Sequence, residues 1–454
     1  MKDNVEFYIK DKWRIKIYTK DGVIEDMVPV GGVVGVIKSA DYGKHFSPTL
    51  IMDAKFSAEQ VYLLKENDNK CICHVTCRRF TFEDSKTTTD EDANDSEIII
   101  DTHFAITFEA EDLSFIHNMS PESEITDENQ GDILKMKLND VTLYLTSLEY
   151  TKIRKMAFNE IASGPDIDAG TVLQFLCETT GAKYVVDRPD NIIGYSNIIL
   201  PSTKFKSTIH ALQVLYGIYT EGLLVHYDID GILYILSKLS KVHAHEGKME
   251  TVQLLLSADT SDGGNLVDGK MMYTDDGSNL VVFVPMKFTE NENAVSSGEA
   301  NGDSIIFTNN TFGRETFTYI NGDLDKVNSP IREYLKNSQS HLETGHSFKL
   351  DYDEISNPFN LLSKLVEDSI CNYITVSIKN PNMDMFKPNI IYTANIVDGS
   401  NEDVLRYKNR FFMVSGYEIT WHNEGLYQAD AYMVSTANVV LVDINFDENR
   451  KRYV

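Results

Sequence analysis

The sequence lacks the features that mark membrane-spanning and secreted proteins. In 454 residues no run approaches the ~18 consecutive apolar residues of a membrane span, and residues 1–6 (MKDNVE) lack the apolar core of a secretory signal. Cysteine is scarce as well. The five cysteines, an odd number, argue against a disulfide framework and are typical of synthesis in a reducing compartment. We therefore expect a protein that is made and kept soluble.

Basic residues are scarce relative to acidic ones. The chain has 42 Lys and Arg against 69 Asp and Glu, a formal net charge of −27. Tight binding to a phosphate backbone needs clustered Lys and Arg, so this balance opposes nucleic acid as a tight ligand. Hydrophobic residues at 42% and aromatic residues at 10% are nevertheless too frequent for a disordered acidic chain. At about 150 residues per domain, the length predicts roughly three compact units.

The first third of the chain alternates apolar and polar residues with the period of a β-strand. From residue 5 to residue 17, apolar side chains occupy one face, and Lys12, Arg14 and Lys16 occupy the other. Further strands are predicted over residues 28–37, 61–82 (one or two strands), 98–110, 133–138 and 141–145. The dipeptide Asn139-Asp140 predicts a hairpin turn between the last two. These short strands with barely a helix predict an antiparallel barrel or sandwich up to about residue 150.

The hydrophobic period then changes to that of a helix. Asp168 is a suitable N-cap for a helix that Gly181 would end. A second helix is predicted from Ser207 to Gly222, because apolar residues recur there at helical spacing.

A hairpin is predicted directly after this second helix. Residues 223–227 and 232–236 alternate around the turn sequence Asp-Ile-Asp-Gly at 228–231. Together with the two helices, this hairpin predicts a small α+β insert over about residues 151–239.

Period-two alternation returns in the last part of the chain. Strands are predicted over residues 252–256, 280–288, 374–378, 390–397, 410–421 and 427–434. A single helix is predicted to open at Asn357, with Pro358 at its first position. The segment 289–303 is polar, and residues 443–454 are polar enough to form an arm.

The segment 71–77 (CICHVTC) contains residue types that bind zinc. Its spacing argues against a metal site, because Cys71, Cys73 and Cys77 share one strand face while His74 points to the opposite face. No second pair of ligands follows at zinc-finger distance. We interpret the segment as a buried, inert strand face.

Other candidate sites also have simpler interpretations. The segment 243–246 (HAHE) lacks an identifiable third metal ligand and is interpreted as a solvated edge. The Asp-rich segments 259–264 and 275–277 are interpreted as turns, because Lys270 stands where a calcium loop needs a bidentate Glu. The glycines of residues 31–35 lie in a strand pattern with no helix following, which excludes a dinucleotide loop.

No catalytic motif is visible in the chain. It has neither a Gly-x-Ser-x-Gly elbow nor a His-Glu-x-x-His helix, and paired carboxylates carry no information in a chain with 69 acids. The acidic run 83–97 is interpreted as a solvated loop, since its like charges repel one another. We predict no catalytic, cofactor-binding or metal-ligating residues.

The order of these elements resembles the central baseplate hub proteins of contractile-tailed bacteriophages and the related hub part of contractile injection machines. The resemblance extends over about residues 5–434. The segments that carry it are 28–46, 104–108, 168–236 (with IILP at 198–201, LLVHY at 223–227 and ILYI at 232–235), FFMV at 411–414, GYEI at 416–419 and the return strand at 427–434. Residues 83–97, 121–132 and 289–303 look like insertions relative to the simplest hubs.

The resemblance implies a mainly β fold with two tube-like antiparallel β-barrel domains and a small accessory α+β domain. The expected boundaries are 1–150 for the first barrel, 151–240 for the insert, 241–436 for the second barrel and 437–454 for an arm. It further implies a homotrimeric ring with pseudo-sixfold symmetry that joins the hexameric tail tube to the trimeric spike. Closure of such a ring would pair strand edges across subunits.

The partners that the resemblance implies are the chain itself, the central spike, the tail tube or its initiator, the baseplate wedge proteins and a tape-measure protein. The expected location is the tail baseplate of the virion, assembled in the host cytoplasm. DNA would pass through the lumen during ejection without specific binding. The net charge of −27 suggests that carboxylates lining the lumen repel the phosphate backbone.

Two alternatives to a non-enzymatic hub stay open. The first is a tail-associated hydrolase of cell-envelope polysaccharide, although no appended lysozyme domain is visible. The second is a receptor-binding tail module, which should show long repeated strands or a collagen-like segment; the chain shows neither.

Overall fold

The computed structural model describes residues 8–67, 70–82, 94–110, 138–200, 203–238, 251–257, 271–273, 279–285, 291–292, 304–309, 315–320, 359, 372–388, 390–396, 411–423, 432–444, 446–447 and 452–453. Within these residues the protein is mainly β with a small α+β insert, which confirms the predicted fold class. None of the described helices has the length and apolar character that crossing a membrane requires.

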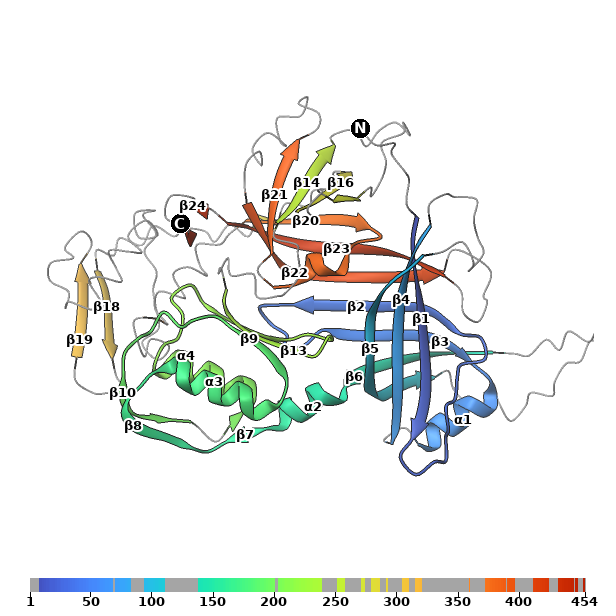
Figure 1. The fold of residues 1–454 in the computed structure, drawn as a ribbon, viewed down its shortest axis with the longest axis horizontal. Helices are drawn as coiled ribbons and strands as arrows, with labels where there is room; N and C mark the ends of the chain where they lie inside the picture. Colours follow the sequence, from blue (N-terminus) through green and yellow to red (C-terminus); the bar gives the residue numbers. More distant parts are fainter. Residues whose placement is uncertain are drawn as a thin grey trace, which may run out of the picture.

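Six strands from the first third of the chain form an antiparallel run in the order β2-β3-β6-β5-β4-β1 (Figure 1). They are β1 (Tyr8–Thr19), β2 (Val33–Asp41), β3 (Thr49–Phe56), β4 (Cys71–Phe82), β5 (Asn94–Ala110) and β6 (Asn139–Ser147). The predicted alternation of β1 is confirmed, because Trp13, Ile15 and Ile17 are almost fully buried. This inward face forms much of the main hydrophobic core.

A long hairpin near the C-terminus completes this run of strands. Its arms are β22 (Phe411–Asn423) and β23 (Met433–Ile444). β22 pairs with β2 over residues 416–422, and β23 meets β1 at Asp11 and Met433. The pairings therefore form a closed circuit of eight strands, in which segments from the two ends of the chain lie side by side (Figure 1).

The same hairpin carries a second group of strands. β21 pairs with the first residues of β22, and β20 pairs with β23. This group contains β14 (Thr251–Ser257), β15 (Met271–Tyr273), β16 (Asn279–Pro285), β17 (Asn291–Glu292), β20 (Asn372–Lys379) and β21 (Ile391–Ile396). β14 runs parallel to both β16 and β21, a departure from purely antiparallel pairing. Such parallel neighbours need long crossover connections, and strand patterns alone do not predict them.

Two short hairpins lie outside the large sheet. They are β18 (Ser304–Asn309) with β19 (Glu315–Ile320), and β24 (Phe446–Asp447) with β25 (Arg452–Tyr453).

The insert has its own core. Its elements are α2 (Leu148–Lys155), β7 (Ala157–Phe158), β8 (Ile161–Ile167), α3 (Ala169–Thr180), β9 (Lys183–Val186), β10 (Tyr195–Ile199), β11 (Thr203–Lys204), α4 (Phe205–Leu215), β12 (Leu223–Tyr227) and β13 (Ile232–Ser237). α2, α3 and α4 pack with the sheet β12-β13-β9 around a second hydrophobic cluster. The predicted caps of α3 are confirmed: the Asp168 side chain accepts a hydrogen bond from the Thr171 amide (2.6 Å), and Gly181 takes φ +69°.

Helix α4 is shorter than the sequence predicts. It ends at Leu215 instead of continuing to Gly222. The buried Gln213 side chain accepts hydrogen bonds from the amides of Ile218 and Tyr219 and donates one to the Tyr219 carbonyl. These bonds hold residues 216–219 in a non-helical turn. The apolar residues of this turn are also buried, so the spacing of apolar residues predicts a helix that is too long.

Helix α1 (Ala58–Glu66) corrects the prediction of one or two strands over residues 61–82. Only the second half of that range is a strand, β4. Ser57 and Gln60 form a reciprocal capping box, and Val61 and Leu64 are buried one helical turn apart. The Ser-x-x-Gln spacing was therefore a usable helix signal that the apolar residues of the segment obscured.

The predicted turn at Asn139-Asp140 is also wrong. Both residues lie in β6, opposite Phe56 and Lys55 of β3. Pairing with β3 outweighs the local turn preference of Asn-Asp, because tertiary contacts override propensity in a buried sheet.

Several predictions lie outside the described residues. They concern residues 83–93, 121–132, 133–137, 243–246, 259–264, 275–277, 293–303, the helix from Asn357 (apart from residue 359) and residues 427–431 of the return strand. The described return strand is β23, and it continues to Ile444. The predicted arm over 437–454 is therefore wrong for residues 437–444, which pair with β20 and β22 and bury Ala437, Val439 and Leu441 in the core.

A buried charge cluster ties the two ends of the chain together. Asp11 of β1 is 1% exposed and accepts two hydrogen bonds from the Arg79 guanidinium of β4, both 2.9 Å long. The Trp421 indole of β22 donates a third to Asp11 (2.8 Å), and Arg79 donates to the Pro381 carbonyl (2.7 Å). The Trp13 ring packs edge-on against Trp421. We call this cluster the seam.

We expect Arg79→Ala to lower the free energy of unfolding by about 3–5 kcal/mol, because it leaves the Asp11 carboxylate buried without its cation. Urea denaturation followed by tryptophan fluorescence measures the change. The control is Arg78→Ala, which removes an exposed guanidinium from the same strand and should change stability by less than about 0.5 kcal/mol. Equal effects of the two variants would show that the seam does not stabilise the fold.

Candidate functional site at the junction of sheet and insert

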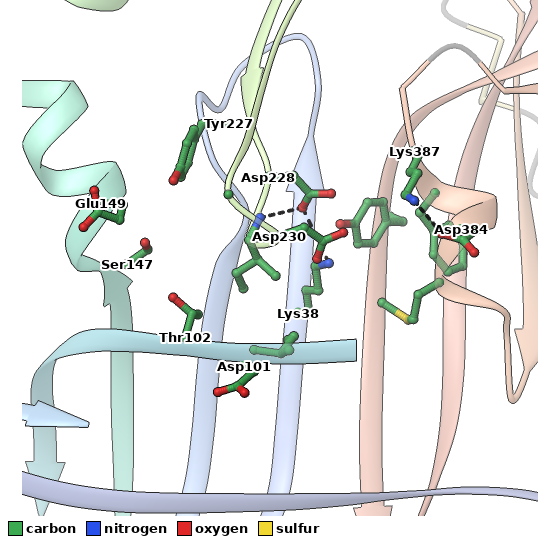
Figure 2. Close-up of a pocket in the computed structure, with 16 residues that line it drawn as sticks. Lys38, Asp101, Thr102, Ser147, Glu149, Tyr227, Asp228, Asp230, Asp384 and Lys387 are labelled. Carbon is green, nitrogen blue, oxygen red and sulfur yellow. Dashed lines mark hydrogen bonds and ion pairs between the residues drawn. The ribbon is translucent and has the colours of Figure 1, made fainter. Parts of the chain in front are cut away.

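A pocket of about 350 Å³ lies where the insert meets the large sheet (Figure 2). Three parts of the chain surround it: the N-terminal strands with the start of α2, the turn of the β12–β13 hairpin, and the 3₁₀ helix Met383–Phe386 with β22. Its lining residues are Lys38, Ile100, Asp101, Thr102, Ser147, Glu149, Tyr227, Asp228, Ile229, Asp230, Gly231, Met383, Asp384, Phe386, Lys387 and Tyr417. The pocket is therefore a three-way junction.

The hairpin turn forms as its sequence predicts. The Gly231 amide donates to the Asp228 carbonyl (3.0 Å), and Gly231 takes φ +82°, a conformation that favours glycine. The Asp228 side chain accepts a hydrogen bond from the Ile229 amide (2.7 Å). The predicted strands pair from Leu223 with Ser237 through to the turn. Local hydrogen bonds thus place Asp228 at the tip of the hairpin.

Asp228 and Lys38 form an ion pair beneath the surface, with Oδ1 and Nζ 3.7 Å apart and both side chains less than a tenth exposed. Burial opposes the charge on Lys38, but Tyr417 and the nearby carboxylates outweigh it and raise the pKa of Lys38. Burial likewise opposes the Asp228 carboxylate, but Lys38 and His226 hold the pKa of Asp228 below its ordinary value. Both groups are therefore charged at neutral pH, and each satisfies the other.

Two further carboxylates lie near this pair (Figure 2). Asp230 is more exposed than Asp228, yet partial desolvation and the Asp228 charge raise the pKa of Asp230 to about 6. Asp384 forms an ion pair with Lys387 (2.6 Å), which raises the pKa of Lys387 against the opposing effect of its own desolvation. Positive charge from β2 and from the C-terminal part of the chain thus faces the acidic tip of the insert hairpin.

His226 precedes the tip and is fully buried. Its ring packs edge-on against Tyr42, with centroids 4.7 Å apart, and the Tyr42 hydroxyl donates to the Phe386 carbonyl. Neither ring nitrogen has a hydrogen-bond partner among the described residues. Desolvation is the main cause that lowers the pKa of His226 to about 4, so the ring is neutral at physiological pH.

The arrangement supports docking of the insert better than catalysis. Acid–base catalysts also contain pairs of carboxylates whose pKa values are shifted in opposite directions. Here, however, Lys38 holds Asp228 beneath the surface, and Asp228 is not free to contact a substrate. Among the described residues no group of three or more His, Cys, Asp or Glu side chains is arranged to hold a metal ion.

The cysteines of β4 lie where the sequence predicts. Cys71, Cys73 and Cys77 are buried on the inner face, and desolvation raises the pKa of both Cys73 and Cys77. His74 is on the outer face, where it bonds to Asp101. The predicted burial of these cysteines on one strand face is confirmed.

Sequence reasoning did not find Lys38 or Lys387 as partners of the hairpin tip. The Asp-Ile-Asp-Gly signal predicted the turn, but nothing local to Lys38 distinguishes it from the other lysines that alternate along strands. Only the approach of β2 and the 3₁₀ helix to the hairpin defines the junction.

The fold and the junction together define a class of protein. In this class a mainly β chain uses a C-terminal hairpin to complete a ring of N-terminal strands, and a buried ion pair fixes the position of an α+β insert. A family model described as "Bacteriophage PBS1 gene 109 protein" matches residues 36–282, which is more than half of the chain. The chain belongs to this family. The prediction of a bacteriophage protein is thereby confirmed.

Solved structures show a similar course of the chain. The tail protein from Neisseria meningitidis MC58 is 9% identical with a TM-score of 0.45, and 97% of this chain and 98% of that one are covered. The 43 kDa tail protein of prophage MuSo2 from Shewanella oneidensis is 8% identical (TM-score 0.42; 94% and 96% covered). The E. coli c3393 protein, a type VI secretion component described as similar to the T4 tail proteins gp27 and gp5, is 7% identical (TM-score 0.41; 96% and 78% covered).

No curated protein matches the sequence of this chain.

The buried neutral His226 makes stability depend on pH. Its pKa is lowered from 6.5 to about 4 in the folded protein, so the unfolded chain binds the proton more tightly. The stabilisation is complete above pH 6.5 and is lost as the pH falls toward 4, by up to about 3 kcal/mol. We expect His226→Leu to remove this loss, measured as the wild-type-minus-variant difference in unfolding free energy between these two pH values.

Asp230 also titrates over this range, and its raised pKa makes the folded protein more stable as the pH falls, the opposite of the effect of His226. Because both proteins contain Asp230, its contribution cancels in the difference between their unfolding free energies. His422→Leu, at an exposed histidine of β22, is the control and should leave the pH dependence unchanged. A variant at position 226 with the wild-type pH dependence would contradict the assignment.

Proposed function

We propose that the chain is a structural adaptor of a phage tail, the hub of its baseplate. Three copies close into a ring with pseudo-sixfold symmetry, join the hexameric tail tube to the trimeric spike, and leave a passage for the genome. The proposal rests chiefly on one observation: the β22–β23 hairpin belongs both to the closed circuit of N-terminal strands and to the C-terminal group of strands. Two sheet-built units are thereby fixed to each other within one chain.

For the units of this adaptor we keep the boundaries expected from the sequence, apart from the start of the arm. One unit is centred on residues 1–150 and the other on residues 241–436, with the insert 151–240 between them. Residues 437–444 belong to β23, so the expected arm is limited to the residues after this strand. Three chains with two units each offer six positions around an axis, which is how a trimer can match a hexamer. Among the described strands, β15 and β17 stand at the two ends of the sheet order. Strands at the ends of a sheet can pair with strands of another copy.

The partners of this adaptor are the spike, the tail tube or its initiator, the wedge proteins and a tape-measure protein. Its place is the baseplate of the virion after assembly in the host cytoplasm. Membership of a bacteriophage family supports a virion role. DNA passes through the ring without sequence-specific contact.

Mass photometry of the purified protein tests the ring. We expect a species of three times 51.4 kDa, about 154 kDa, alone or on addition of the spike protein of the same phage. Three-fold averages in electron micrographs should show a central passage. A chain that stays monomeric with the spike present, or that forms an open filament, would contradict the proposal.

An adaptor should have no hydrolytic activity. We expect purified protein to release no soluble fragments from cell-envelope polysaccharide between pH 5 and 7, the range around the raised pKa of Asp230 of about 6. Asp230→Asn is the matched variant, since it removes the junction carboxylate whose pKa is raised to about 6. Fragment release that this substitution abolishes would favour the hydrolase alternative instead.

A further inference from the structure

Two histidines face each other on the outer side of the large sheet. His74 of β4 and His103 of β5 are directly opposite in the strand register. Their rings stack, with centroids 4.9 Å apart and an angle of 27° between the ring planes. The His74 side chain is 33% exposed and His103 is exposed, so both imidazoles reach solvent. We call His74 and His103 the histidine pair.

Each imidazole has one ring nitrogen engaged by a neighbouring side chain. His74 Nε2 donates a hydrogen bond to the Asp101 carboxylate, since an ionised carboxylate can only accept. A hydrogen bond of 2.9 Å joins His103 Nδ1 to the Tyr18 hydroxyl, and the Tyr18 ring packs edge-on against the His103 ring. These contacts leave Nδ1 of His74 and Nε2 of His103 available.

The same arrangement is typical of histidines that bind metal ions. A metal-binding histidine almost always donates its other ring N–H to a carboxylate, a carbonyl or water, which fixes the tautomer and makes the binding nitrogen more basic. Asp101 accepts this bond from His74, and the Tyr18 oxygen can accept the Nδ1 proton of His103. Both rings can therefore present a lone pair to an ion.

The spacing of the two strands suits a shared ion. Side chains directly opposite each other on antiparallel strands have Cβ atoms about 4.5–5.5 Å apart. Two nitrogens that bind one tetrahedral zinc ion, each about 2.0–2.1 Å from the metal, are about 3.3 Å apart. A metal lies in the plane of each imidazole that binds it, so the stacked rings must turn about their Cβ–Cγ bonds. This torsion has broad freedom in histidine.

The chemistry of the pair selects the class of ion. Imidazole is a ligand for Zn²⁺, Cu²⁺ and Ni²⁺, whereas Mg²⁺ and Ca²⁺ prefer oxygen ligands. Lys16 of β1 is opposite His74 on its other side, and the Asp101 carboxylate offsets this positive charge. Among the described residues no group of three or more ligands is arranged to hold a metal, so water fills the remaining positions. Binding is therefore weaker than in centres with three or four protein ligands.

We propose that the histidine pair binds a divalent transition-metal ion of the zinc type, with water as its other ligands. The ion joins β4 to β5 across the outer face of the sheet. The pair is not visible in the sequence, because its members belong to separate strands and meet only through the register of β4 and β5. The inference goes beyond the proposed adaptor role and holds whether or not three chains form a ring.

Isothermal titration calorimetry of the untagged full-length protein with ZnCl₂ tests the proposal. We expect the wild type to bind an ion that neither His74→Gln nor His103→Gln binds. Asp101→Asn keeps both ligands but removes the carboxylate that orients His74, and it should weaken binding about 10–100-fold. Excess Mg²⁺ should not displace the zinc, because imidazole is a poor ligand for Mg²⁺.

Two matched controls separate the pair from other histidines of the chain. His422→Gln removes an exposed histidine of β22, and His243→Gln/His245→Gln removes another closely spaced pair in the sequence. Both controls should bind zinc at this site like the wild type. Because folding brings the two rings together, zinc should raise the Tm of the wild type and of both controls but not that of His103→Gln. The same melts without zinc show whether each variant is folded.

Electron paramagnetic resonance of the protein loaded with Cu²⁺ identifies the ligands directly. We expect hyperfine splitting from two imidazole nitrogens in the wild type and its loss in His74→Gln.

Four outcomes would overturn the proposal. They are no zinc binding by the wild type, equal binding by the wild type and His103→Gln, loss of binding in the His243→Gln/His245→Gln control instead, and displacement of zinc by Mg²⁺ at a similar concentration. The third would place the ion at the other pair of histidines, and the fourth would indicate a site made of carboxylates.

Discussion

The structure depends on one buried contact between the ends of the chain. Asp11 accepts hydrogen bonds from Arg79 and from Trp421, which follows it by 410 residues. A carboxylate this deeply buried is tolerated only because a guanidinium and an indole satisfy it. Through this contact β1, β4 and β22 are held in one register. The circuit of eight strands is therefore complete only when the C-terminal hairpin has joined the N-terminal strands.

A buried ion pair at the junction pocket likewise joins the insert to the large sheet. The hairpin tip carries a buried carboxylate, Asp228, which meets the buried ammonium of Lys38 on β2. Because either charge alone would be costly in this environment, the pair fixes where the insert docks. The neutral His226 ring beside Tyr42 fills the apolar part of the contact. A chain whose parts are joined by matched charges and a shared hairpin suits an adaptor that transmits shape between partners.

Sequence patterns predicted much of the local structure. The alternation around Trp13, the Asp168 cap, the Gly181 stop and the turn before Gly231 each depend on near neighbours, and each is confirmed. Where prediction failed, a distant contact competed with a local preference. The Asn139-Asp140 turn became strand because β3 pairs with it, and α4 ended early because Gln213 binds the backbone beyond it. The candidate site was the least predictable part, since its charges come from three separated segments.

The sequence by itself determined the strand pattern around Trp13, the caps of α3, the hairpin of the insert, and the return to strands in the C-terminal part. These properties arise from backbone geometry and side-chain burial over a few residues. Only the tertiary structure decided that β22 and β23 close the N-terminal circuit, that β14 runs parallel to its neighbours, and that Lys38 meets Asp228. The physical reason is that a strand edge can pair with any other strand edge, and a charge with any opposite charge. Which strands and which charges meet is decided by the packing of the whole chain.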